Sequence, residues 1–290
     1  MTENIFDVLT KKYTQLTKTE RKVADFVFAN KAAVQYYSIA SFAENCGVGE
    51  ASVFRFCKSL SLGGYNEFKL AVARSLMQNE VYNEKTEKAP SMFGKVVATD
   101  SFSDLCQKLY NSQVSALSQT IDLAKASDFE RASTLLTAAK RVFCFGQGNS
   151  LILAMIAWSR FISVSKKFYC VEDAHLQATN AALCDEEDVI LVFSYSGSTR
   201  DMMDILPAAK KNGARIILVT RFENSPAAKL ADVVLMCGSN EGPLQVGSMA
   251  AKVAQLMVID ILFNEYWIKN EQECAQNTEA TAQIISKKLI

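Results

Sequence analysis

VILVFSYSGSTRDMMDILPAAKKNGARIILVT, residues 189–220, is the stretch of the sequence that decides the fold. It opens with an unbroken apolar run, passes through a short loop of serine, glycine and threonine into a stretch of helical length, and closes with a second apolar run. A strand exposed on one face alternates apolar and polar residues, whereas a strand of a parallel sheet covered by helices on both faces is apolar throughout. The stretch therefore predicts a strand–helix–strand unit of an α/β domain.

The same alternation extends in both directions along the chain. Apolar runs typical of strands cover 141–146, 166–171, 188–196, 214–220 and 232–237. Stretches of helical pattern cover 150–164, 174–183, 199–212, 225–231 and 246–267. Because crossovers between parallel strands are right-handed, we predict an α/β doubly wound domain with a five-stranded parallel sheet over 126–268. A helical tail, 269–290, follows and ends in three apolar residues, Ile284, Ile285 and Leu289.

Residues 1–76 follow a different pattern, in which apolar residues recur at helical spacing. Thr17 stands three residues before Glu20, which is the spacing of a capping box at the start of a helix. Helices are then expected over 38–45 and 50–60, separated by a short glycine-containing turn. This pattern predicts an all-α helix-turn-helix domain, whose second helix would enter the major groove of DNA.

The outer face of that second helix carries the side chains that would contact DNA. Its apolar residues Val53, Phe56, Cys57 and Leu60 recur at i, i+3, i+4 and i+7 and face the core. The residues left on the outside are Ala51, Ser52, Arg55, Lys58 and Ser59. Arginine can bond a guanine bidentately and serine can bond a base or a phosphate. On spacing alone, the solvated face of an ordinary helical bundle fits equally well.

Charge and composition narrow the class of protein. Residues 1–76 hold ten Lys and Arg against seven Asp and Glu, and the rest of the chain is acidic by the same margin, which is compatible with nucleic-acid contact at the N-terminal end. No apolar run approaches the roughly 18 residues of a transmembrane helix, and the N-terminus lacks the order of a signal peptide. The eight cysteines include no CxxC pair. We therefore expect a cytoplasmic protein with reduced thiols, no membrane contact and no metal site.

The segment 77–125 is predicted to connect the two domains. Its first part, 78–100, is polar and contains Pro90 and Gly94, as linkers do. Its second part, 101–125, has the apolar spacing of a connecting helix.

Two loops at the carboxyl ends of predicted strands carry the chemistry of the α/β domain. They are Gly146-Gln147-Gly148-Asn149-Ser150 and Ser194-Tyr195-Ser196-Gly197-Ser198-Thr199, and each leads into a helix. In a doubly wound sheet this edge is where ligands bind. Glycines such as Gly146 and Gly148 let the backbone come close to an anion, helix N-termini offer unpaired N–H groups, and hydroxyls add neutral donors. The combination suits a phosphate monoester, with the serine-rich loop the more specific signal.

Both halves of the chain resemble known domains. Residues 17–75 resemble the N-terminal domain of the RpiR family of bacterial regulators in the stretches LTKTERKVADFVFAN, SIASFAENCGVGEASVFRFCKSL and LGGYNEFK. They depart from the family at Gly49, where serine usually caps the second helix, and at Ser61, where glycine is common. Residues 126–268 resemble a SIS, or sugar-isomerase, domain. That resemblance implies phosphate contacts from Ser150, Ser194, Ser196 and Thr199, with backbone help at Gly148 and Gly197.

Together these features predict a transcription regulator of carbohydrate or amino-sugar metabolism that binds a double-stranded DNA operator as a homodimer or homotetramer. A phosphosugar in the SIS domain would control it, without a cofactor and without catalysis. The alternative is a sugar-phosphate isomerase or lyase with an appended helical domain. His175, the only histidine, and Glu241 are the groups nearest to being candidate bases, and the sequence leaves the role of both open.

Overall fold

The computed structural model describes residues 4–83, 96, 98–239, 242, 244 and 248–287, with side chains omitted over 77–83. The chain divides into two compact units, one formed by residues up to Leu109 together with 240–248, and the other by 110–239 and the residues from Met249 onward. Each unit is described by itself below. No helix of the described residues is both long and apolar enough to cross a membrane.

The first unit is all helix, as predicted. Its helices are α1 (Ile5–Lys12), α2 (Lys18–Ala29), α3 (Lys31–Val34), α4 (Ile39–Asn45), α5 (Glu50–Ser59) and α6 (Tyr65–Asn83), with a short 3₁₀ turn at Tyr13–Gln15. The predicted capping box is present at the start of α2, where Thr17 and Glu20 exchange hydrogen bonds. Three aromatic side chains, Phe42, Phe56 and Phe68, are fully buried and join α4, α5 and α6, with Phe68 edge-on to Phe56 and tilted against Phe42.

The second unit contains the predicted parallel sheet. Helix α7 (Phe102–Leu123) leads into α8 (Ala126–Ala138), and the remaining elements alternate: β1 (Arg141–Gly146), α9 (Asn149–Ile162), β2 (Phe168–Cys170), α10 (Ala174–Leu183), β3 (Asp188–Phe193), α11 (Arg200–Lys211), β4 (Arg215–Thr220), β5 (Val233–Met236), α12 (Met249–Lys269) and α13 (Glu271–Ser286). All neighbouring strands are parallel, in the order β2-β1-β3-β4-β5.

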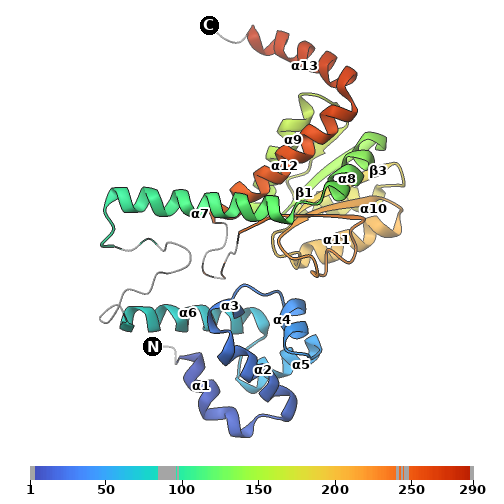
Figure 1. Cartoon of the computed structure of the whole chain (residues 1–290). Coiled ribbons are helices and arrows are strands. Elements are labelled where there is room, and N and C mark those ends of the chain that lie inside the picture. Colours follow the sequence, from blue (N-terminus) through green and yellow to red (C-terminus); the bar gives the residue numbers. More distant parts are fainter. Residues whose placement is uncertain are drawn as a thin grey trace. The chain divides into compact units, whose positions relative to one another are not determined.

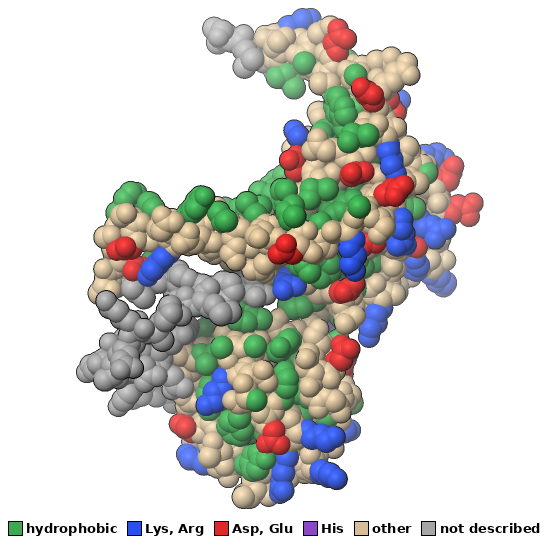
Figure 2. Space-filling model, in the orientation of Figure 1, with side chains coloured by type: hydrophobic (Ala, Val, Ile, Leu, Met, Phe, Trp, Pro, Cys, Tyr) green, Lys and Arg blue, Asp and Glu red, His purple; other side chains and the backbone are tan. Residues whose placement is uncertain are grey.

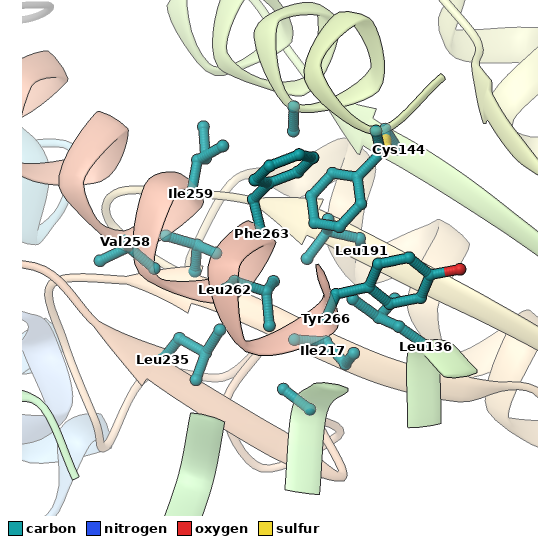
Figure 3. Close-up of a cluster of buried hydrophobic side chains, with 14 of the residues drawn as sticks. Leu136, Cys144, Leu191, Ile217, Leu235, Val258, Ile259, Leu262, Phe263 and Tyr266 are labelled. Atoms are coloured by element: carbon teal, nitrogen blue, oxygen red, sulfur yellow. The ribbon is translucent and has the colours of Figure 1, made fainter. Parts of the chain in front are cut away.

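Helices cover both faces of this sheet (Figure 1). Alternate residues of β1 face opposite sides of the sheet. Val142 and Cys144 lie in a core shared with α8, α9 and α12, while Phe143 and Phe145 lie in a core shared with α10 and α11. In Figure 3, Tyr266, Phe263 and their neighbours on α12 lie over the strands that carry Cys144, Leu191, Ile217 and Leu235. This double burial explains why the strand sequences are apolar throughout.

Three expectations about elements need correction. The segment 225–231 forms successive turns rather than a regular helix, and the N–H of Ala227 at its start bonds to the carbonyl of Gly197 in a different part of the chain. Helix α6 continues to Asn83 and so takes in the first residues of the predicted linker. Helix α8 was not predicted from the sequence. The linker residues 84–95 lie outside the described part of the chain, as do Glu241 and Leu289.

Candidate functional site

The loop between β1 and α9, called here the Gly146 loop (146–150), turns tightly at its two glycines. A Cβ at Gly146 would lie 2.5 Å from the carbonyl oxygen of Ser150, so only glycine fits there. Gly148 caps α9 with φ +56°, and a Cβ at this position would meet nothing within 4 Å. Open space above a left-handed glycine at a helix N-terminus gives an anion access to the backbone.

A buried glutamine from α10 holds this loop in place. Gln177 is fully buried, and its side-chain Nε2 donates to the carbonyl oxygens of Gly146 at 3.0 Å and Val171 at 2.6 Å. Its Oε1 accepts a hydrogen bond of 3.1 Å from Nε2 of Gln147. One amide therefore joins the ends of β1 and β2 to the loop, a role that the sequence analysis missed.

The loop between β3 and α11, called here the Ser194 loop (194–199), presents several hydroxyl groups. The Oγ of Ser194 lies 3.4 Å from Oγ1 of Thr199, the N-cap residue of α11, whose side chain makes no capping bond. Gly197 has φ +59°, and a Cβ there would collide with the side chain of Ser225. Ser196 is exposed, and its Oγ accepts a bond of 3.2 Å from the N–H of Ser198.

The sheet brings these two loops together. Strands β1 and β3 are hydrogen-bonded neighbours, and Gly146 pairs in register with Phe193, the residue before Ser194. Both loops therefore lie at the same edge of the sheet, and helices α9 and α11 both begin there. Neutral hydroxyls, backbone N–H groups and two positive helix ends can stabilise a doubly charged phosphate without a cationic side chain. The residues predicted to contact phosphate thus lie on two neighbouring loops.

The candidate bases gain no support from their positions. His175 is exposed in the first turn of α10, and its carbonyl oxygen accepts a hydrogen bond from Thr179. Among the described residues its ring forms no hydrogen bond or ion pair with either loop, and Glu241 lies outside them. Among the described residues, no cluster of His, Cys, Asp or Glu could hold a metal ion.

In the first unit, α5 exposes the face that the sequence predicted. Ala51, Arg55 and Lys58 are exposed, whereas Ser52 and Ser59 are half-buried. The Nη2 of Arg55 donates to Oγ of Ser52 at 3.0 Å, and Oγ of Ser59 donates to the carbonyl of Phe56 at 2.8 Å. The turn before α5 passes through Gly47 at φ +63°, and Gly49 caps α5 without a side-chain bond.

A carboxylate from α2 lies against this helix. Partial burial alone would raise the pKa of Glu20, but hydrogen bonds from Thr17 and Ser59 and the charge of Arg55 outweigh it, so the pKa lies below its usual value. Glu20 therefore caps α2 and also faces two residues of the candidate DNA-binding face. The capping pattern was visible in the sequence, whereas this contact with α5 was not.

Comparison with known proteins agrees with the domains predicted for both halves of the chain. The helix-turn-helix domain of the rpiR family matches residues 3–79, and the SIS domain matches residues 135–265. An HTH-type transcriptional regulator of Caldanaerobacter subterraneus is 30% identical over 287 residues, covering 99% of both chains. The HTH-type transcriptional regulator HexR of Escherichia coli is 27% identical, covering 98% of this chain and 95% of that one.

One solved structure matches almost the whole chain. The NanR protein of Vibrio vulnificus complexed with ManNAc-6P is 26% identical, covers 99% of both chains and has a TM-score of 0.85. A helical head and a SIS domain in this order define a two-domain transcription regulator. The chain belongs to the rpiR family of helix-turn-helix regulators.

Proposed function

We propose that a phosphosugar binds at the Gly146 and Ser194 loops and thereby sets the affinity of α5 for an operator. The observation that carries this proposal is the meeting of two hydroxyl-rich and glycine-rich loops at one sheet edge, both at helix N-termini. The ManNAc-6P complex of the NanR relative supports a phosphorylated amino sugar as the first class to test. The effector must bind two states of the protein with different affinity, since otherwise it shifts nothing.

The phosphate contacts proposed are Ser150, Ser194, Ser196 and Thr199, with the backbone of Gly146, Gly148 and Gly197. The DNA contacts proposed are Ala51, Ser52, Arg55, Lys58 and Ser59. We propose no catalysis, because the ring of His175 forms no hydrogen bond or ion pair with either loop among the described residues, and the relatives compared above are named as regulators. A protein that binds the operator works where the chromosome is, so we place it in the cytoplasm.

We also propose that the second unit pairs with a second copy of itself. Helices α7, α9 and α12 surround an apolar pocket of about 380 Å³ lined by Leu117, Ile156, Val253, Leu256, Met257 and Ile259. Exposed apolar side chains continue this surface along α7 and α9 (Val114, Ile121, Ile152 and Met155), and Figure 2 shows hydrophobic side chains gathered along α7. Large exposed apolar surfaces usually mark interaction sites.

The charges at the rim of this pocket favour a second copy over an unrelated partner. Arg160 and Asp260 lie 3.3 Å apart beside the pocket. In a two-fold contact the same patch meets itself, so Arg160 of one copy can face Asp260 of the other. Two copies would also present two DNA-reading helices to the two halves of a palindromic operator.

Thermal shift against a panel of sugar phosphates tests the proposed effector site. A hexose or N-acetylhexosamine phosphate should raise the melting temperature in a concentration-dependent way, while the same sugars without phosphate should not. The active compound should then change DNA affinity in a gel-shift titration. If no phosphosugar shifts the melting temperature or the DNA affinity, the proposed control is wrong.

A further inference from the structure

Helix α5 carries one side chain that its burial pattern does not explain. Phe54 is 46% exposed. Within 4–76, the described part of the first unit's helical core, it is the only large hydrophobic side chain that is exposed. Burial of apolar area is what makes such a ring stabilising, so a ring left partly in water gains free energy when a partner covers it.

The ring is also held in a defined position. The Nζ of Lys58 lies over it, 5.2 Å from the ring centroid. On another side lies the backbone of Gly64, where an added Cβ would be 3.4 Å from Cε2 of Phe54. A cation–π contact and a close backbone together restrict the ring, so little conformational entropy remains to be lost when it binds.

Phe54 lies on the border of the DNA-binding face. Ala51 and Lys58, both exposed, are three residues before it and four residues after it, which places all three on one side of the helix. Arg55 is the next residue and is also exposed. When α5 enters the major groove with Arg55 and Lys58 toward the DNA, Phe54 enters beside them.

We propose that Phe54 is a specificity-determining residue that reads a thymine through its C5-methyl group. This inference rests on the proposed DNA-binding role of α5 and deepens it. A phenyl ring cannot bond a phosphate or the donors and acceptors of a base edge, and thymine is the base that presents an apolar group in the major groove. Lys58, stacked on the ring, is placed to contact the backbone phosphate beside that base.

The test begins by selecting the preferred DNA sequence of the full-length wild-type chain from a random pool. Each thymine of the selected site is then replaced by deoxyuridine, which removes only the methyl group. We expect one thymine in each half-site at which this replacement weakens binding about fourfold, the equivalent of one buried methyl group.

The Phe54→Ala variant separates a reading role from a structural one. In this variant the thymine and deoxyuridine sites should bind equally well, while the dependence on salt stays as in the wild type, because the phosphate contacts remain. Phe54→Leu keeps an apolar contact and should keep part of the discrimination. Equal loss of affinity for both DNAs, with the fourfold difference intact in Phe54→Ala, would assign Phe54 a purely structural role and overturn the proposal.

If Phe54→Ala does not fold, Phe54→Leu carries the test: unchanged fourfold discrimination in that variant overturns the proposal, and reduced discrimination supports it. The wild-type measurements can also refute the proposal by themselves. A site without any thymine whose methyl group affects binding refutes the reading role of Phe54 and leaves the DNA-binding proposal standing. A wild-type chain that selects no DNA sequence at all refutes DNA recognition by α5, and the role of Phe54 with it.

Discussion

The side-chain amide of Gln177 donates a hydrogen bond of 3.0 Å to the carbonyl oxygen of Gly146, from a residue that is fully buried. Gln177→Met keeps the volume of the side chain but leaves the Gly146 carbonyl, which is buried as well, without that donor. A buried polar group that loses its partner costs about 1–3 kcal/mol. We expect that loss in the free energy of unfolding, measured in urea by tryptophan fluorescence, together with weaker binding of the effector.

Gln255 supplies the matched control. It is also buried, but its Oε1 has no hydrogen-bond partner in the described chain, and its Nε2 bonds only to the Ala251 carbonyl of its own helix. Gln255→Met removes an unsatisfied oxygen, so stability should stay the same or rise. If both methionine variants lose the same stability, the Gln177 contact has no special role in holding the Gly146 loop.

Ser61 adopts a backbone conformation that suits glycine. It follows the last residues of α5 at φ +64°, which costs a residue with a Cβ about 1–2 kcal/mol. Ser61→Gly should therefore raise the stability of the first unit by about 0.5–1 kcal/mol, because part of the gain is offset by the freer unfolded chain. Gly47→Ala should do the opposite, since Gly47 has φ +63°. Far-ultraviolet circular dichroism during urea unfolding checks both signs.

Arg55 is the charged residue of α5 expected to contribute most to sequence recognition. Arg55→Ala should weaken operator binding by about 1–3 kcal/mol. Arg55→Lys keeps the charge but not the two-pronged donor geometry, so it should keep the dependence on salt and lose the preference for the correct base. Full operator affinity of Arg55→Ala in a gel-shift titration would show that α5 is not the reading helix.

Ile156 tests the proposed self-association. It is 38% exposed and lines the apolar pocket between α7, α9 and α12. Ile156→Lys would place a charge in the interface, and light scattering on the full chain at micromolar concentration should report a smaller assembly than the wild type. Leu183→Lys is the control, because Leu183 is 73% exposed on α10, which covers the other face of the sheet. If both variants assemble as the wild type does, the pocket is not the interface.

The sequence predicted the fold well wherever the pattern was set by burial. All five strands were found because burial on both faces makes a strand apolar throughout, and the three helices of the reading head were found because burial on one face gives helical spacing. The pattern failed at 225–231, where Ala227 bonds to Gly197 through a contact that no local periodicity reveals. It also placed the end of α6 too early, because polar residues continue a helix as readily as they form a linker.

The candidate site was predictable only in part for a similar reason. Glycine and hydroxyl residues directly after an apolar strand are visible in a sequence. The buried amide of Gln177 acts on a loop some thirty residues earlier, and a single glutamine in a helix has no pattern that indicates it. The sequence analysis gave Phe54 no role, because a helical projection places this residue between the buried and the exposed faces of α5.

The exposed hydroxyl of Ser196 tests whether the Ser194 loop binds the effector. The Oγ of Ser196 accepts a hydrogen bond from the N–H of Ser198, so its own proton remains free for an incoming phosphate. A hydrogen bond to a charged group is worth about 1.5–3 kcal/mol, so Ser196→Ala should lower effector affinity about tenfold or more. DNA affinity without effector should not change, because Ser196 lies in the other unit. Ser198→Ala, which removes a hydroxyl bonded to the Ser196 carbonyl, is the control and should change effector affinity less.

Turnover must be measured in the same preparation, because an isomerase would bind the same phosphate with the same loops. Such an enzyme also needs a base beside the sugar carbon. His175, the candidate base among the described residues, is exposed at the start of α10. We therefore expect no product by NMR when the protein is incubated with hexose, pentose and N-acetylhexosamine phosphates. Isomerisation or ether cleavage at an enzymatic rate, abolished by His175→Gln or Glu241→Gln, would establish an enzyme. Loss of ligand-dependent DNA release in Ser196→Ala without any turnover would establish a sensor, since then the phosphate site acts on DNA affinity alone.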